Sequence, residues 1–223
     1  MPDAAAPLLY LITDGALTPD SQGFSRLLNL IEAAVNARFA LVQIREKALP
    51  GRALYELARQ AAALTKGSAT RLLLNDRADI ARAAGADGVH LTAQSLDAAV
   101  IRRAFGPDFI IGVSTHALAE ARAARDGGAD FATFGPVFDT PSKRAYGPPV
   151  GLETLAETAS NLPRFPVFAL GGVTLANAPQ TCAAGAAGLA AISLFANAAT
   201  LDAAARQLRF NGKFSINNRH YWE

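Results

Sequence analysis

The chain has 223 residues, 51% of them hydrophobic, which is enough for one large core and too little for two domains of comfortable size. Its 21 Lys and Arg residues against 19 Asp and Glu leave a formal charge of +2. That charge is too small for the broad positive field that nucleic-acid or membrane-surface binding needs. We therefore expect a single domain that binds neither nucleic acid nor membranes.

The chain ends and the one cysteine indicate a cytoplasmic protein. The first apolar run, Leu8–Ile12, is much shorter than a signal or membrane segment. Cys182 has no second cysteine and no metal-ligand spacing around it, so we expect a small buried side chain. Residues 210–223 drop the alanine-rich helical pattern of residues 1–209. They form a C-terminal tail whose order the sequence does not decide.

Short apolar runs typical of strands alternate with longer alanine-rich stretches typical of helices. The eight expected strands are Leu8–Asp14, Ala40–Lys47, Arg71–Asp76, Gly88–Thr92, Ile110–His116, Phe131–Val137, Pro166–Gly172 and Gly188–Phe195. Between them, Ala53–Thr65, Leu118–Gly127 and Leu152–Ala159 place Leu or Ala at helical spacing with charges on the other face. Eight such units predict a single (β/α)8 TIM barrel, an α/β fold with its active site at the C-terminal ends of the strands.

A doubly wound dinucleotide-binding sheet is the weaker interpretation. That fold needs a glycine-rich turn after its first strand, and residues 13–16 read Thr-Asp-Gly-Ala, without the G-x-G-x-x-G fingerprint. The longest interruption of the alternation, Phe138–Val150, follows the sixth expected strand. It is the expected lid of the barrel.

Polar side chains gather at the end of the second expected strand. Alternation along this strand predicts that Gln43, Arg45 and Lys47 point to one side, with Ile44 and Glu46 on the other. Ion pairs at the barrel rim are the structural alternative. Three inward polar groups in a row, however, require water or a ligand.

The third expected strand ends with Asn75 and Asp76. Taken alone, Asp76 reads as the N-cap of a helix that begins at Arg77. Beside Arg45 and Lys47, its carboxylate could instead hold a divalent cation against a polyphosphate.

Three further strand ends complete the predicted mouth. The fifth delivers Ser114–His116 to the rim. The seventh closes with Gly171–Gly172 and the eighth with Ile192–Ser193, where barrels often bind phosphate through backbone N–H groups. A tight turn is the structural alternative for the two glycines, and a phosphate cradle is favoured.

These segments, in this order, resemble those of thiamine phosphate synthases and their thiazole tautomerase relatives. The resemblance covers all but about the last fifteen residues and rests on Tyr10–Asp14, Val42–Lys47, Asn75–Asp79, Gly85–Leu91, Gly112–His116, Phe134–Lys143, Gly171–Gly172 and Ile192–Ser193. It implies a transferase that joins hydroxymethylpyrimidine pyrophosphate to a hydroxyethylthiazole phosphate, carboxylated or not. Thiamine phosphate and pyrophosphate would be the products. The pyrophosphate would leave first, so the enzyme would act by charge stabilisation and positioning.

The resemblance also implies roles for individual residues. Gln43 would contact the pyrimidine, and Asp76 would hold Mg²⁺. The implied pyrophosphate ligands are Arg45, Lys47, Asn75, Ser114 and Lys143, of which Arg45, Lys47, Ser114 and Lys143 are the expected catalytic residues. The hydroxyls of the closing loop would be those of Thr140 and Ser142, and the thiazole-phosphate cradle would comprise Gly172, Ile192 and Ser193.

One departure concerns the metal. Synthases typically carry a second metal carboxylate where this chain has Ser95, and Asp97 is a candidate substitute. One carboxylate with pyrophosphate oxygens could still hold Mg²⁺, more weakly. The alternatives are a metal-free thiazole tautomerase-like isomerase and a non-catalytic phosphate-binding paralogue. The sequence decides neither the thiazole form nor whether the protein is a homo-oligomer.

Overall fold

A computed structural model describes residues 6–18, 23–140 and 147–210 of the chain. Two predicted site residues, Ser142 and Lys143, lie outside the described residues, as does the tail beyond residue 210. The last helix runs to Phe210, one residue past the predicted end of the domain.

Strands and helices alternate as predicted. The strands are β1 Leu8–Ile12, β2 Leu41–Ile44, β3 Arg71–Asn75, β4 Gly88–Leu91, β5 Ile110–Thr115, β6 Phe131–Phe134, β7 Val167–Leu170 and β8 Gly188–Ala191. The helices are α1 Gly23–Asn36, α2 Gly51–Thr65, α3 Ala78–Ala84, α4 Ala98–Phe105, α5 Leu118–Asp126, α6 Gly151–Asn161, α7 Ala178–Ala183 and α8 Ala198–Phe210, and a short 3-10 helix spans Ser193–Phe195.

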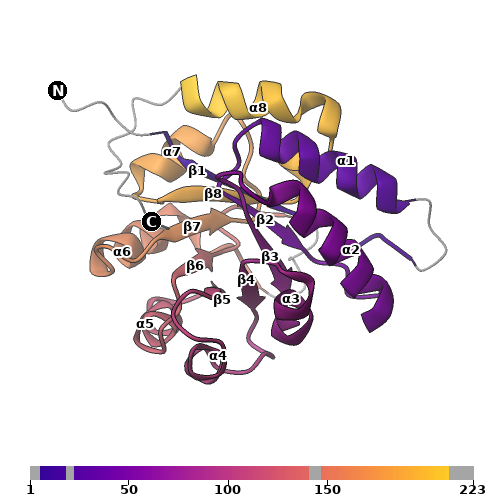
Figure 1. The fold of residues 1–223 in the computed structure, drawn as a ribbon. Coiled ribbons are helices and arrows are strands. Elements are labelled where there is room, and N and C mark those ends of the chain that lie inside the picture. Colours follow the sequence, from indigo (N-terminus) through magenta and orange to yellow (C-terminus); the bar gives the residue numbers. More distant parts are fainter. Residues whose placement is uncertain (1–5, 19–22, 141–146, 211–223) are drawn as a thin grey trace.

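The eight strands form a closed parallel barrel in sequence order, and the helices surround it (Figure 1). Closure is made by β1 and β8, whose register pairs Leu8 with Gly188 and Leu11 with Ala191. Outside this seam, α1 and α8 lie side by side. The predicted (β/α)8 barrel is therefore confirmed.

Alternation along the strands separates two apolar clusters, because successive side chains point to opposite faces of the sheet. The larger cluster fills the layer between the barrel and its helices and includes Leu9, Val42 and Leu72. The smaller one fills the barrel interior and includes Tyr10, Phe131 and Phe168. Toward the C-terminal ends of the strands, interior positions become polar, and this change places the candidate site.

All eight strands end earlier than predicted, by one to four residues. β2, for example, ends at Ile44 rather than Lys47, and β8 ends at Ala191 rather than Phe195. Parallel pairing requires a neighbour in register on both sides, and that requirement is not visible in the propensity of one segment. Many predicted functional residues consequently lie in loops just beyond the strands.

Arg102 of α4 ties together the loops at the N-terminal end of β5 and β6. Its guanidinium bonds the Asp130 carboxylate at 2.7 Å, and that carboxylate also accepts the Ile111 N–H at 2.6 Å. The same guanidinium donates to the carbonyls of Gly106, Pro107, Phe109 and Gly128. One side chain therefore satisfies several loop carbonyls at once.

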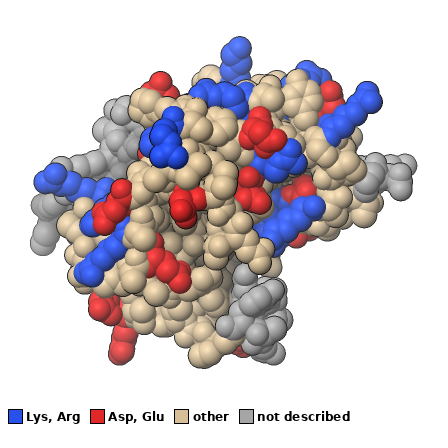
Figure 2. Space-filling model, turned by 90° about the horizontal axis from the view of Figure 1, so that it is seen from below, with Lys and Arg blue, Asp and Glu red and all other residues tan. Residues whose placement is uncertain are grey.

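Charges of both signs are interspersed on the face shown in Figure 2, with no broad field of one sign. Among the described residues, no helix is long and apolar enough to cross a membrane.

Candidate active site

The end of β2 departs from the predicted alternation. Gln43 lies in the strand and is 2% exposed, so its side chain belongs to the barrel interior. Arg45 and Lys47 follow the strand in a loop, where Arg45 is half-buried and Lys47 is exposed. The predicted strand end at Lys47 is therefore wrong, and strand pleating orients only Gln43 of these three side chains.

Glu46, predicted to face away from Arg45, is buried and organises the loop after β1. Its carboxylate accepts hydrogen bonds from the Thr13 hydroxyl at 2.6 Å and from the N–H groups of Gly15 and Leu17 at 3.3 and 2.9 Å. Thr13 Oγ1 in turn accepts the Arg45 N–H at 2.8 Å. This clamp fixes the backbone at Arg45.

A hydrogen-bond network crosses the barrel interior and connects three of the predicted residues. Gln43 Nε2 donates to Asn75 Oδ1 at 3.2 Å, and the Tyr10 hydroxyl donates to Gln43 Oε1 at 3.1 Å. The Tyr10 oxygen also lies 3.1 Å from His90 Nδ1, and His90 Nε2 lies 3.0 Å from Ser114 Oγ. Tyr10 and His90 thus connect the predicted residues Gln43, Asn75 and Ser114. We call these five residues the interior network.

Burial keeps the centre of this network neutral. It raises the pKa of Tyr10 well above its ordinary value and lowers the pKa of His90 from 6.5 to about 3. Neither residue was predicted as a functional one. The sequence does contain a signal for both residues. Each is a polar residue at an interior-facing position of a mainly apolar strand, where an unpaired polar group is costly.

Asp76 directly follows β3 in the left-handed region, with φ of 64°. The N-cap interpretation is wrong, because α3 begins at Ala78 and its N-cap position is Arg77. A non-glycine residue rarely adopts this conformation, and such residues cluster at ligand sites. The Asp76 carboxylate is exposed and accepts no hydrogen bond from the residues that the structure describes. The hydrogen bond to Asp79 is the main cause that raises the pKa of the neighbouring Arg77 guanidinium, and the Asp76 charge raises it further. It suits a cation that keeps several waters, as Mg²⁺ does.

Ser95, at the expected position of the second metal carboxylate, forms hydrogen bonds within the turn that precedes α4. Its Oγ accepts the Thr92 N–H at 2.8 Å and lies 3.2 Å from the Thr92 hydroxyl. The candidate substitute, Asp97, is exposed at the N-cap position of α4. Within the described part of the chain, no group of three or more His, Cys, Asp or Glu side chains is placed to hold a metal ion. Asp76 is left as the candidate ligand.

The residues predicted to form a phosphate cradle follow β7 and β8. Gly171 and Gly172 have φ of 91° and 65°, and a Cβ at Gly172 would lie 2.7 Å from Phe138 Cβ. The start of the expected lid packs here, since Phe138 N donates to the Gly171 carbonyl at 3.1 Å. Both glycines are therefore required by this close approach as well as by their backbone conformation.

The other predicted residues of this region lie close by in the chain. Ile192 is half-buried just after β8, and Ser193 is exposed at the start of the 3-10 helix. Thr140, in the expected lid, is the last residue described before the gap at 141–146 and is half-buried. His116, at the end of β5, is exposed, and its Nδ1 is hydrogen-bonded to the Gly135 carbonyl.

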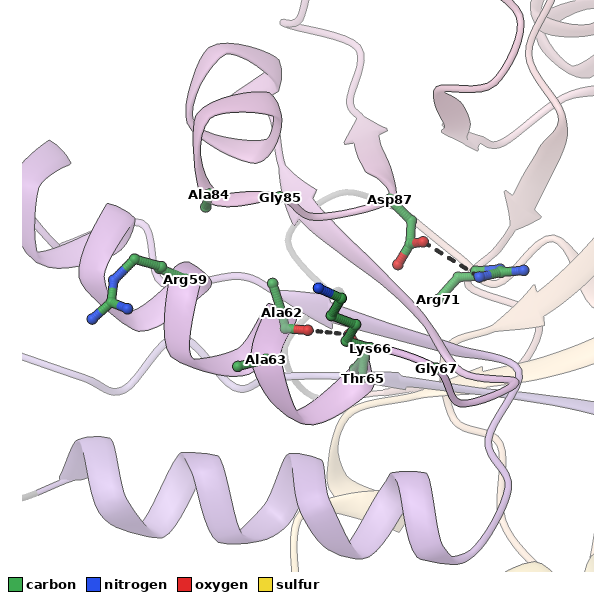
Figure 3. A pocket seen from close by; sticks show the side chains of 10 residues that line it. All are labelled: Arg59, Ala62, Ala63, Thr65, Lys66, Gly67, Arg71, Ala84, Gly85 and Asp87. Carbon is green, nitrogen blue, oxygen red and sulfur yellow. Dashed lines mark hydrogen bonds and ion pairs between the residues drawn. The ribbon is translucent and has the colours of Figure 1, made fainter.

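Two hollows of similar size lie at opposite ends of the barrel. The one in Figure 3, about 420 Å³, lies between the C-terminal ends of α2 and α3, and its Arg71 is paired with Asp87 at 3.6 Å. This hollow lies at the N-terminal ends of β3 and β4, away from the predicted site residues. The other, about 430 Å³, is lined by the end of β1, by α1 and by Ile192. It adjoins the predicted cradle at the mouth.

A model of the family described as thiamine monophosphate synthase matches residues 9–195. The chain belongs to this family. A protein of Geobacter sulfurreducens, named only provisionally as a thiamine-phosphate synthase, is 53% identical over 185 residues, 83% of this chain and 84% of its own. The thiamine-phosphate synthase of Moorella thermoacetica is 41% identical over 201 residues, 90% of this chain and 93% of its own.

A solved structure supports the same family. The thiamine phosphate pyrophosphorylase from Pyrococcus furiosus superposes with a TM-score of 0.77 at 31% identity and covers 91% of this chain and 94% of its own. The comparisons confirm the fold, the family and the enzyme class predicted from the sequence, a thiamine phosphate synthase and hence a transferase.

Proposed function

We propose that the protein joins hydroxymethylpyrimidine pyrophosphate to hydroxyethylthiazole phosphate, or to its carboxylated form, by a dissociative route. The observation that carries this assignment is the interior network. It links Gln43, buried in the barrel, to Asn75 and Ser114, which are half-buried. An amide for a heterocycle and hydrogen-bonding groups for an anion are thereby held in one arrangement.

The reaction needs binding and charge stabilisation but no protein nucleophile. The bond between the pyrimidine methylene carbon and the pyrophosphate oxygen breaks, and its electron pair leaves with pyrophosphate. The thiazole nitrogen lone pair then forms the new carbon–nitrogen bond. Arg45 and Lys47 are suited to stabilise the departing charge, and the Gln43 amide to orient the pyrimidine.

The remaining predicted residues complete the proposed site. Gly172, Ile192 and Ser193 would receive the thiazole phosphate. Thr140, Ser142 and Lys143 of the lid would cover the mouth and exclude water, which otherwise captures a cationic intermediate. Lys143 would add its charge to the pyrophosphate.

Asp76 would hold the proposed Mg²⁺, which when bound supplies positive charge to the pyrophosphate oxygens. Ser95 in place of a second carboxylate favours one competing assignment, a thiazole tautomerase-like isomerase that needs no metal. We also propose that the protein is cytoplasmic. A homo-oligomer is compatible with the proposed reaction.

One experiment separates these functions. The protein is incubated with both proposed substrates, with and without Mg²⁺, while thiamine phosphate and pyrophosphate are measured. Metal-dependent formation of both products supports the coupling reaction. Isomerisation of the thiazole with neither product at any Mg²⁺ concentration would instead establish the isomerase, and binding without turnover a non-catalytic paralogue.

A further inference from the structure

Tyr10 occupies the centre of the interior network and has a single proton to give. Its oxygen lies 3.1 Å from both Gln43 Oε1 and His90 Nδ1. All three side chains are at most 2% exposed, so they must satisfy one another. Because Tyr10 donates to Gln43, the contact with His90 requires an imidazole proton on Nδ1.

This tautomer determines the direction of the next hydrogen bond. A neutral imidazole with its proton on Nδ1 has a lone pair on Nε2. Ser114 Oγ, 3.0 Å away, must then donate its proton inward to His90. The Thr133 hydroxyl is a more distant partner of the same nitrogen, at 3.4 Å. The orientation of the Gln43 amide therefore decides, through two neutral side chains, where the Ser114 proton points.

We propose that Tyr10 and His90 are positioning residues that couple the orientation of the Gln43 amide to the direction of the Ser114 hydroxyl. This inference rests on the proposed function, in which Gln43 contacts the pyrimidine and Ser114 contacts the pyrophosphate. Binding at one position would thus prepare the other.

The network has a second direction that is equally complete. Gln43 then presents Nε2 to Tyr10, Tyr10 donates to His90 Nδ1, and His90 Nε2–H donates to Ser114. Each group ends with the same number of protons, because His90 gives up its Nδ1 proton to solvent water and binds another proton from water at Nε2. Asn75 is half-buried and can turn its own amide to follow. Only this direction frees the Ser114 proton for an anion, which accepts hydrogen bonds and cannot donate them.

The surrounding packing holds the two rings in place. Tyr10 makes edge contacts with Phe131 and Phe168 at ring-centroid distances of 5.7 and 5.8 Å. A Cβ at Gly112 would lie 2.6 Å from His90 Nδ1, so the ring occupies space that this glycine leaves. Reversal of the network therefore involves protons and amide orientation rather than movement of the rings.

Nitrogen-15 NMR of the His90 ring in the full-length protein tests the inference directly, with the His90→Gln variant used for assignment. We expect the Nδ1–H tautomer in the free protein and the Nε2–H tautomer with Mg²⁺ and inorganic pyrophosphate. In Tyr10→Phe, the tautomer should no longer respond to pyrophosphate. An Nε2–H form in the free protein, or a switch that survives Tyr10→Phe, would overturn the inference.

Single-turnover kinetics test the consequence for the reaction. Tyr10→Phe should lower the rate of pyrophosphate release about tenfold, with little change in KM for the thiazole phosphate. Tyr10→Phe/Ser114→Ala should be no slower than Ser114→Ala, because Tyr10 acts through Ser114. Tyr55→Phe, the same change on the outer helix α2, is the matched control and should keep the parent rate. Additive losses, or an equal loss in Tyr55→Phe, would contradict the coupling.

The two proposals fail in different ways. A protein that neither binds pyrophosphate nor makes thiamine phosphate contradicts the proposed function, whatever its His90 tautomer. An active protein whose free form has His90 Nε2–H, or whose Tyr10→Phe variant keeps the full rate, contradicts the inference alone. Thermal midpoints of every variant show whether a rate loss reflects unfolding.

Discussion

The Glu46 carboxylate and the Thr13 hydroxyl are joined by a buried hydrogen bond of 2.6 Å. This contact connects the loops that follow β1 and β2, and the same carboxylate also accepts N–H groups of Gly15 and Leu17. Glu46, which was not among the predicted site residues, therefore fixes the backbone of Arg45 through Thr13.

Glu46→Gln should destabilise the fold and reduce activity. The amide loses one acceptor oxygen, so a buried N–H group is left without a partner, at a cost of about 1–3 kcal/mol. Displacement of Arg45 should lower kcat/KM for the pyrimidine pyrophosphate about tenfold. Urea unfolding and steady-state kinetics measure the two effects. The control is Glu32→Gln, at an exposed position of α1. Equal stability of the two variants would contradict the role proposed for Glu46.

Ser95→Asp should lower the Mg²⁺ concentration that gives half-maximal activity. A carboxylate at this position would add a second anionic oxygen ligand to that of Asp76. It can also keep the hydrogen bond from the Thr92 N–H. Mg²⁺ titrations of the initial rate provide the measurement, with Ser95→Asn as an uncharged control. An unchanged metal requirement would place residue 95 outside the metal shell.

Lys143→Ala should cut turnover strongly and leave folding nearly unchanged. A charge-assisted contact that strengthens as pyrophosphate departs can contribute roughly 2–4 kcal/mol, or about 10²–10³ in rate. An exposed lysine without that role would change stability by less than about 0.5 kcal/mol and leave catalysis alone. Single-turnover rate and thermal midpoint are measured on one preparation, beside Lys66→Ala. A normal rate would remove Lys143 from the site.

His90 should make folding stability depend on pH in mildly acidic solution. Its folded-state pKa of about 3 lies below the ordinary value of 6.5, so folding favours the neutral ring. This contribution is fully present above pH 6.5 and is lost as the pH falls toward 3. From about pH 7 to about pH 5, the loss is about 2 kcal/mol.

The difference in pH slope between the parent protein and His90→Gln isolates this contribution, because the other titrating groups are common to both. Urea unfolding at several pH values supplies the slopes. Parallel slopes would show that His90 titrates normally in the folded protein.

Arg102→Leu should lower the unfolding free energy by about 2–4 kcal/mol, because the Asp130 carboxylate and several loop carbonyls lose their donor. Arg103→Leu, its exposed neighbour on α4, should change stability by less than about 0.5 kcal/mol. Thermal unfolding of the two variants measures the difference. A loss of similar size in both would assign the effect to helix α4 rather than to the loop contacts.

The sequence by itself determined the number and order of the strands. The alternation of apolar runs with Leu- and Ala-patterned helices is local, and eight such units without a dinucleotide fingerprint favour a closed barrel over a doubly wound sheet. Ordered motifs across the chain also identified the family and its enzyme class, which the comparisons confirm. The burial of Cys182, predicted because the chain has no second cysteine and no metal-ligand spacing around it, is also confirmed.

Only the tertiary structure decided where the strands end and which polar groups meet. A strand stops where its neighbours no longer pair in register, so Arg45 and Lys47 belong to a loop despite their alternating spacing. Tyr10 and His90 lie 80 residues apart and touch because barrel closure brings their strands to one interior. Hydrogen bonds of this kind depend on distances across the barrel, which no local pattern of residues contains.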